Sequence, residues 1–360
     1  MLRVGIVGAG QMGAKRAREV ARDADARLVA VADQNARRAQ ALAESYACRA
    51  GTEWEALVAA PDVDAVVVAT SPRWLAPVSR GALQARKHVL CEKPLATTAV
   101  EAAQLVACAA QSAVKLKTGF NHRHHPAVWQ AHALAEAGRI GRLLGIRSRY
   151  GHGGRAGYER EWRADPVESG GGELMDQGIH ALDLFRWFLG EFSEVSAMLQ
   201  SAFWSAPVED NAFCTLRTPG GQVASLHVSW TQWKNLFSFE VFGEHGYLIV
   251  EGLGGSYGSE HLIIGRRPAD FGLPAEERIE FPGEDCSWAR EWEEFTAAIR
   301  EDRRPLADGF DGWQALRLVQ AAYESARTGR AISVAEEESY AQPGIHRGIS
   351  RRHQAGGGDH

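Results

Sequence analysis

At 360 residues the chain is longer than a single hydrophobic core ordinarily supports, and we expect two domains. Its hydrophobic content of 45% and charged content of 24% are typical of globular proteins and exclude disorder over most of its length. The net charge of −5 excludes strong attraction to nucleic acid or an anionic membrane, and no apolar run reaches the roughly 18–20 residues of a membrane span. Five scattered cysteines without a C-x-x-C pair indicate a reducing compartment, and we expect a cytoplasmic protein.

The first third of the chain alternates short apolar runs with helical patterns. The apolar runs predict strands over Leu2–Val7, Leu28–Ala32, Ala65–Ala69, His88–Cys91 and Lys115–Gly119. The segments between them predict helices over Ala14–Arg22, Ala36–Ser45, Leu75–Ala85 and Thr98–Ala110. Strands that alternate with helices in this way predict a parallel sheet that is covered on both faces.

A glycine motif, Gly8-x-Gly10-x-x-Gly13, directly follows the first predicted strand and opens the first helix. Gly8 permits a tight turn, Gly10 lets the backbone approach a pyrophosphate, and Gly13 lets helix and strand pack closely. The helix N-terminus then stabilises the phosphates, and we expect Gln11 and Met12 to contact the cofactor as well. The alternative is a structural glycine turn in another kind of α/β protein.

An acidic residue, Asp33, ends the second predicted strand at the spacing from Gly13 that dinucleotide-binding folds use. Its carboxylate should accept hydrogen bonds from both ribose hydroxyls and repel a 2′-phosphate, so we expect NAD in preference to NADP. Arg37 and Arg38 lie just downstream and would soften that preference, but exposure on the helix surface is the favoured interpretation. We therefore predict an α/β Rossmann domain over residues 1–120.

After residue 120 the pattern changes to two helices followed by strands at hairpin spacing. The predicted helices are Ala127–Ala137, Asp176–Leu189, Trp288–Arg300 and Asp311–Thr328, and the predicted strands are Glu194–Trp204, Asn211–Arg217, Gln222–Trp230, Ser238–Phe242, Tyr247–Glu251 and Leu262–Ile264. This order predicts an α+β domain over residues 121–335 with a large, mostly antiparallel open sheet. Residues 336–360 are predicted to be a disordered tail. Because two of the strands carry apolar residues on both alternations, we expect another subunit to cover the sheet in a homodimer or homotetramer.

Two further motifs complete a recognisable pattern: Glu92-Lys93-Pro94 after a strand, and Gly170-Gly171-Gly172 followed by Asp176, Gly178 and His180. With the N-terminal glycine motif, they resemble the Gfo/Idh/MocA family of oxidoreductases over nearly the whole chain. The resemblance implies that Lys93 lies beside the nicotinamide and the reacting carbon, with Asp176 and His180 completing the catalytic site.

The resemblance also implies which side chains contact the ligands. The cofactor contacts that it adds are Thr70, Ser71, Glu92 and Lys93. The substrate-side residues that it implies are Asn121, Arg123, Trp162, Arg163, Asp176 and His180, to which we add Tyr150 as an aromatic near the mouth of the site.

Physical chemistry agrees with these roles. Asp176 and His180 are four residues apart, so on a helix they share one face. Lys93 or His180 can then move the hydroxyl proton while hydride passes to nicotinamide C4. We predict an NAD-dependent dehydrogenase for a hydroxyl of a sugar-like substrate, or the reverse reduction. Redox-assisted elimination or glycoside cleavage in the same site is one alternative, and a non-catalytic ligand sensor with this fold is another.

The segment Tyr150–Arg163 is rich in glycine, arginine and aromatic residues and precedes the catalytic helix. Its candidate phosphate ligands are Arg149, Arg155, Arg160 and Arg163. We therefore favour a phosphorylated or nucleotide-linked sugar over a neutral one. A metal bound by Asp176 and His180 would need further ligands such as His122, His124 or His125, but these do not stand at a recognisable ligand spacing, and we expect no metal.

Overall fold

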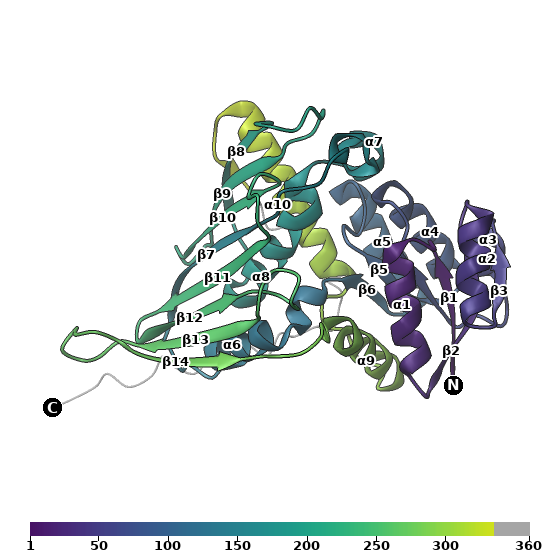
Figure 1. Cartoon of the computed structure of the whole chain (residues 1–360), viewed down its shortest axis with the longest axis horizontal. Coiled ribbons are helices and arrows are strands. Elements are labelled where there is room, and N and C mark those ends of the chain that lie inside the picture. Colours follow the sequence, from purple (N-terminus) through teal and green to yellow (C-terminus); the bar gives the residue numbers. More distant parts are fainter. Residues whose placement is uncertain (335–360) are drawn as a thin grey trace.

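The computed structural model describes residues 1–334, so the tail predicted over residues 336–360 lies outside the described residues. Figure 1 shows an N-terminal sheet layered between helices and, beside it, a larger second sheet whose helices face the first domain. Across residues 1–334, every helix is too short or too polar to span a bilayer.

The N-terminal sheet has six parallel strands in the order β3-β2-β1-β4-β5-β6. Its strands are β1 (Leu2–Val7), β2 (Ala26–Ala32), β3 (Arg49–Gly51), β4 (Ala65–Val68), β5 (His88–Glu92) and β6 (Leu116–Gly119). Its helices are α1 (Gln11–Arg22), α2 (Ala36–Ser45), α3 (Trp54–Ala59), α4 (Pro72–Gln84) and α5 (Ala99–Ser112). The strand order is that of a Rossmann fold and confirms the predicted parallel sheet. The short elements β3 and α3 were not predicted.

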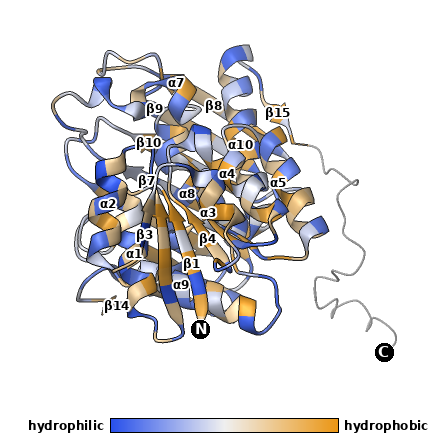
Figure 2. Cartoon of the chain, turned by 90° about the vertical axis from the view of Figure 1, so that its right-hand side faces the viewer, coloured by the Kyte–Doolittle hydropathy of each residue, from blue (hydrophilic) through white to orange (hydrophobic). Residues whose placement is uncertain are grey.

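Burial on both faces explains why the strands of this sheet are apolar throughout. Val4, Ile6 and Val66–Val68 are fully buried, and Figure 2 shows β1 and β4 as apolar ribbons between the helices. Because the strands are parallel, the carboxyl ends of β1, β4 and β5 meet at one edge. That edge brings together the glycine motif, Thr70 and Lys93, which follow those three strands.

The second sheet has nine strands in the order β14-β13-β12-β11-β7-β10-β9-β8-β15. Its strands are β7 (Leu143–Gly151), β8 (Glu194–Gln200), β9 (Asn211–Arg217), β10 (Val223–Ser229), β11 (Leu236–Gly243), β12 (Gly246–Glu251), β13 (His261–Arg266), β14 (Ala275–Glu280) and β15 (Ile332–Ser333). Neighbours are antiparallel except β7 and β10, which run parallel. The mostly antiparallel sheet is thus confirmed, whereas its central strand β7 was not predicted.

One face of this sheet packs against helices that lie between the two domains (Figure 1). The helices of this part are α6 (Pro126–Glu136), α7 (Pro166–Ser169), α8 (Ile179–Leu189), α9 (Ser287–Arg300) and α10 (Gly309–Thr328). Short turns of helix are η1 (Asn121–His124), η2 (Tyr158–Arg160), η3 (Trp162–Ala164) and the π-helical η4 (Leu174–Gly178). Helix α9 differs from the other helices of this part, because it packs on the N-terminal domain: its Trp292 and Phe295 belong to the core of that domain.

The opposite face of the sheet is open and mixed in character. In β10 the outward positions are Val223, Ser225 and His227, while the positions between them are buried. The expectation of apolar side chains on both alternations is therefore wrong for this strand. Exposed apolar side chains do occur on the same face, and Phe213 of β9 stacks on His227 with ring centroids 4.1 Å apart.

Candidate active site

The glycine motif adopts the geometry that a dinucleotide requires. Gly8 has a φ of +99°, and a Cβ there would overlap the carbonyl of Ala69. A Cβ on Gly13 would overlap the carbonyl of Gly8, whereas one on Gly10 would meet nothing within 4 Å. No side chain of residues 1–334 caps the N-terminus of α1, so its first N–H groups are available to an anion. The loop therefore fits a pyrophosphate.

Asp33 stands just after β2 and holds the glycine motif in place. Its Oδ2 accepts a hydrogen bond from the backbone N–H of Ala9 at 2.7 Å, and its Oδ1 accepts one from Asn35 at 2.8 Å. The side chains of Arg37 and Arg38 are exposed, while their backbone N–H groups bond to Asn35. A carboxylate at this place suits a ribose that carries two hydroxyls.

A cavity of about 460 Å³ lies between the two domains at the edge where β4 and β5 end. Ten of the predicted ligand-binding residues line it: Met12, Thr70, Glu92, Lys93, Asn121, Tyr150, Trp162, Arg163, Asp176 and His180. The predicted residues that do not line it are Gly8, Gly10, Gln11, Gly13, Asp33, Ser71 and Arg123. Ser71 donates its hydroxyl hydrogen bond to Glu168 at 2.9 Å instead.

Three charged side chains meet on one wall of the cavity. Lys93 Nζ lies 2.7 Å from Asp176 Oδ1 and also donates to the Asp176 carbonyl, and Arg163 Nε donates to Asp176 Oδ2 at 3.1 Å. Burial alone would raise the pKa of Asp176, but the charges of Lys93 and Arg163 outweigh it and hold that pKa below its ordinary value. Asp176 is therefore a carboxylate that fixes the ammonium group of Lys93.

His180 lies beside this group in the first turn of α8. Its pKa is held well below 6.5, first by burial and then by the nearby charge of Lys93. Its Nδ1 is buried without a hydrogen-bond partner among residues 1–334, while the ring itself lines the cavity. The regular helix predicted from Asp176 is wrong in its first turn, which is the π-helical η4, yet both side chains still reach the cavity.

Glu209 positions the glycine-rich turn that leads to Asp176, and the sequence did not identify it. This carboxylate accepts hydrogen bonds from the backbone N–H groups of Gly172 and Leu174 at 3.1 and 3.0 Å, and from the hydroxyl of Tyr323 at 2.9 Å. A Cβ on Gly172 would overlap the Glu209 backbone. No local sequence pattern predicts this role, because Glu209 meets Gly172, Leu174 and Tyr323 only in the folded chain.

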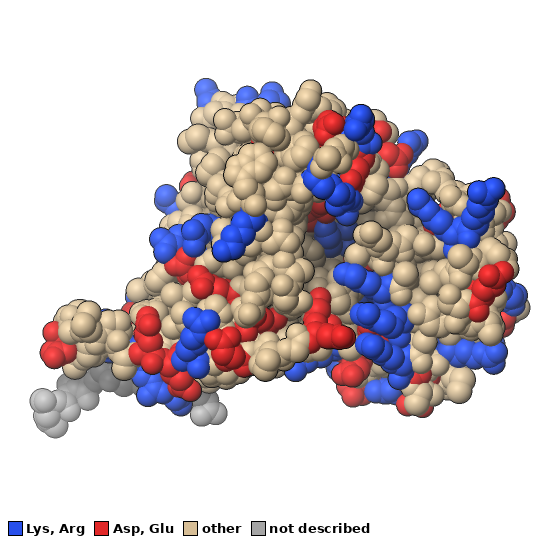
Figure 3. Space-filling view, viewed as in Figure 1, with Lys and Arg blue, Asp and Glu red and all other residues tan. Residues whose placement is uncertain are grey.

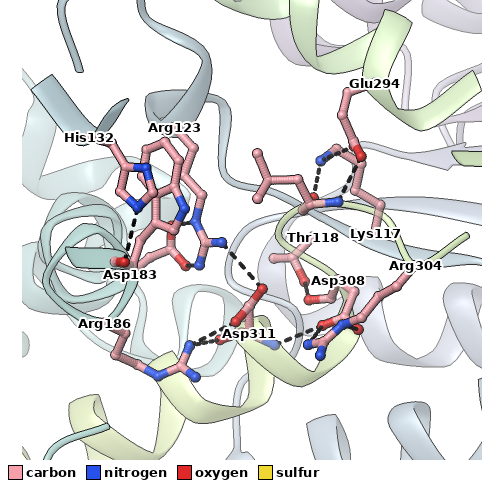
Figure 4. Close-up of polar contacts among 12 residues, drawn as sticks. Lys117, Thr118, Arg123, His132, Asp183, Arg186, Glu294, Arg304, Asp308 and Asp311 are labelled. Carbon is pink, nitrogen blue, oxygen red and sulfur yellow. Dashed lines mark hydrogen bonds and ion pairs between the residues drawn. The ribbon is translucent and has the colours of Figure 1, made fainter. Parts of the chain in front are cut away.

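Arg123 is expected from the sequence on the substrate side, but this residue does not line the cavity and lies behind its wall. Its guanidinium binds Asp183 through two nitrogens at 2.8 and 2.5 Å and reaches Asp311 at 3.3 Å. Figure 4 shows how Asp311 continues the network to Arg186. Both Arg123 and Asp183 are buried, so the arginine neutralises a buried carboxylate and is not free to bind substrate.

The predicted arginine cluster is also rearranged by the fold. Arg149 is on the open face of β7, since Tyr150 beside it faces the cavity. Arg155 and Arg163 pair with Glu161 at 2.7 and 3.5 Å, and Arg160 lies 3.7 Å from Glu159. Figure 3 shows Lys and Arg side chains along the rim of the hollow on the N-terminal-domain side, with Asp and Glu across from them.

Comparisons with known proteins place both domains in one family. Residues 2–120 match the family described as "Oxidoreductase family, NAD-binding Rossmann fold", and residues 128–249 match "GFO/IDH/MocA C-terminal domain". The chain is 30% identical to an inositol 2-dehydrogenase of Rhizobium meliloti over 93% of its own length and 99% of the relative's. It is 31% identical to a 1,5-anhydro-D-fructose reductase of Ensifer adhaerens with the same coverage.

Solved structures with this fold include enzymes in complex with the cofactor. GenD2 from gentamicin A biosynthesis in complex with NAD superposes with a TM-score of 0.80 at 26% identity, over 93% of this chain and 96% of that one. A levoglucosan dehydrogenase in complex with NADH and L-sorbose has the same fold, with a TM-score of 0.85 at 23% identity over 93% of this chain and 99% of that one. From its two matched domains and these relatives, the chain belongs to the Gfo/Idh/MocA family of NAD-binding oxidoreductases.

Proposed function

We propose that this oxidoreductase is a dehydrogenase that oxidises a hydroxyl of a sugar or cyclitol, or reduces the corresponding ketone, with Lys93, Asp176 and His180 as its catalytic residues. The observation that carries the proposal is the meeting of a paired lysine and an uncharged histidine in one cavity, next to a loop that fits a dinucleotide. A relative that is an inositol 2-dehydrogenase supports the substrate class.

Each side chain has a separate task in the proposed reaction. NAD, when bound, accepts the hydride at nicotinamide C4. Lys93 donates a hydrogen bond to the reacting oxygen and stabilises the negative charge that grows there. Asp176 keeps the ammonium group aimed at that oxygen. His180, uncharged because of burial and the charge of Lys93, accepts the hydroxyl proton.

The arrangement of arginines favours an uncharged substrate over the phosphorylated or nucleotide-linked one that the sequence suggested. A phosphate needs cations that are not already satisfied by carboxylates. Of the cavity arginines, Arg155 and Arg163 share Glu161, and Arg163 also binds Asp176. Hydroxyl groups of a neutral sugar need only the hydrogen-bonding groups that line the cavity, such as Tyr158 and Asn235.

The test is a screen of cyclitols, free sugars and their phosphorylated or nucleotide-linked forms, with formation of NADH as the readout. For the best substrate, Lys93→Met and His180→Asn should each lower kcat by roughly 10²–10⁴-fold and leave NAD binding intact. Lys115→Met is the matched control, because Lys115 is as buried as Lys93, at 18% side-chain exposure, and is also paired with an aspartate. Near wild-type turnover in either active-site variant would contradict the assignment. Cleavage of a glycoside without net NADH would point to redox-assisted elimination.

A further inference from the structure

A second histidine, His122, lies directly against His180. The two ring centroids are 3.8 Å apart and the ring planes differ by 18°, so the imidazoles are stacked. His122 belongs to η1, which follows the end of β6 after one intervening residue, and the residue is 6% exposed. The proposed reaction gives this residue no role, although it covers one face of the imidazole that takes the proton.

Hydrogen bonds determine which nitrogen of His122 carries a hydrogen. Ser287 donates its hydroxyl hydrogen to the carboxylate of Asp285 at 2.6 Å, so Ser287 Oγ must accept from Asn121 Nδ2, at 2.9 Å. The amide oxygen of Asn121 then faces His122 Nδ1 at 3.2 Å, and this oxygen can only accept. Nδ1 therefore carries the hydrogen of His122.

The other nitrogen of His122 is satisfied without a second proton. Nε2 lies 3.0 Å from the hydroxyl of Tyr150, which can donate to it. The uncharged ring therefore uses both of its nitrogens, and Tyr150 and Asn121 hold its plane from opposite sides. His180 therefore stacks on an uncharged ring that is hydrogen-bonded at both of its nitrogens.

We propose that His122 is a positioning residue for His180: its fixed, uncharged ring sets the plane of His180 and shields the inner face of that ring from water, so that His180 meets the substrate as a neutral proton acceptor. This inference rests on the proposed role of His180 in the reaction. It concerns a contact between two side chains of this chain and requires no further ligand.

The charges around the two stacked rings also favour their uncharged form. Lys93 after β5 and His125 just after η1 act on His180 through their charge, and His122 stacks on its ring. Asp176 of η4 and Tyr150 of β7 line the same cavity. A proton on each stacked ring would place two positive charges next to each other beside Lys93. Burial is the first cause that holds the pKa of both His122 and His180 well below 6.5, and the charge of Lys93 lowers both pKa values further.

The experiment compares variants that remove the ring with one that keeps it. His122→Asn opens the inner face of His180 to water, so the pKa of His180 and the acid limb of kcat/KM should both rise by roughly one pH unit. His122→Phe keeps a ring over His180 and should leave that limb at the wild-type pH, although it loses the hydrogen bonds to Asn121 and Tyr150. The matched control is His132→Asn, because the His132 ring is also stacked, on Trp187 at 3.7 Å, but outside the cavity.

Two readouts separate this inference from the proposed function. NMR titration of the imidazoles in the full-length protein reports the pKa of His180 without any substrate, and the pH profile of kcat/KM reports it through turnover. If wild-type protein oxidises no sugar but His122→Asn still shifts the NMR titration, the proposed function fails and the stacked pair stands. An unshifted His180 in folded His122→Asn, or an equal shift in His132→Asn, overturns the inference. His122→Gln replaces His122→Asn if the latter does not fold.

Discussion

The buried pair of Arg123 and Asp183 yields the sharpest stability prediction. Arg123→Met keeps most of the side-chain volume but leaves the Asp183 carboxylate, which is 0% exposed, without its bidentate partner. Removing one member of a buried pair costs about 3–5 kcal/mol, because the remaining charge is neither solvated nor paired. Burial already raises the pKa of Asp183, and loss of Arg123 raises it further.

A raised pKa in the folded state fixes the sign of the pH dependence. Folded Asp183 would keep a proton that the unfolded chain releases near its ordinary pKa of 3.8, so the variant should lose stability as pH rises above that value. Urea unfolding followed by circular dichroism should therefore give a larger loss at about pH 8 than at about pH 5.

An exposed pair of the same kind provides the control. Arg3 binds Asp64 at 2.6 Å, but their side chains are 44% and 34% exposed, so solvent screens the pair. Arg3→Met should leave the unfolding midpoint almost unchanged. If Arg123→Met costs no more than Arg3→Met, burial is not what makes the Arg123 pair matter, and the reasoning is refuted.

Three further predictions concern the cofactor, pH and assembly. Asp33→Ala should reduce the preference for NAD over NADP at least roughly tenfold, about 1.4 kcal/mol, measured as the ratio of two dissociation constants by calorimetry; equal binding of both by wild-type protein would contradict the role of Asp33. The carboxylate of Glu173 is buried with neither oxygen bonded to residues 1–334, and burial raises its pKa well above 4.5. Glu173→Gln should therefore raise the melting temperature by an amount that grows as pH rises above 4.5; a gain that is the same at every pH argues against a protonated Glu173. Because Met198 and Phe213 are 76% and 45% exposed on the open sheet face, we expect a homodimer or homotetramer that Phe213→Lys weakens in light scattering, and a wild-type monomer at micromolar concentration would refute this.

The sequence predicted best those features that depend on local pattern. The glycine motif, Asp33 and the strands β1, β2, β4 and β5 follow from short-range apolar runs and spacing, and the structure has them nearly where they were expected. By contrast, β3 is only three exposed residues long and α3 only six, so neither gives a periodic signal. Strand β7 gives a weak apolar signal, because its outward positions carry Arg147 and Arg149 and it contains Gly145 and Gly151.

The central residues of the candidate site could be predicted from the sequence, but the contacts around them could not. Lys93, Asp176 and His180 stand in motifs, and all three line the cavity. The partners of Arg123 could not be predicted, because Asp183 and Asp311 lie 60 and 188 residues away in the chain. That Arg149 and Tyr150 point to opposite faces of the sheet could be predicted once β7 is known to be a strand, since neighbouring residues on a strand alternate between its faces.

The contacts of helix α9 determine where this chain can be truncated. Arg16 of α1 pairs with Glu92, which precedes Lys93, and with Glu291 of α9, which lies 275 residues further along the chain than Arg16. Trp292 and Phe295 of α9 fill the same core as β1. A recombinant fragment that ends after β6, the last strand of the N-terminal domain in the sequence, would lack α9. It would expose the apolar face that Trp292 and Phe295 cover, and the buried guanidinium of Arg16 would lose Glu291. When domains are exchanged between relatives, α9 should therefore be transferred together with the N-terminal domain, although the two are far apart in the sequence.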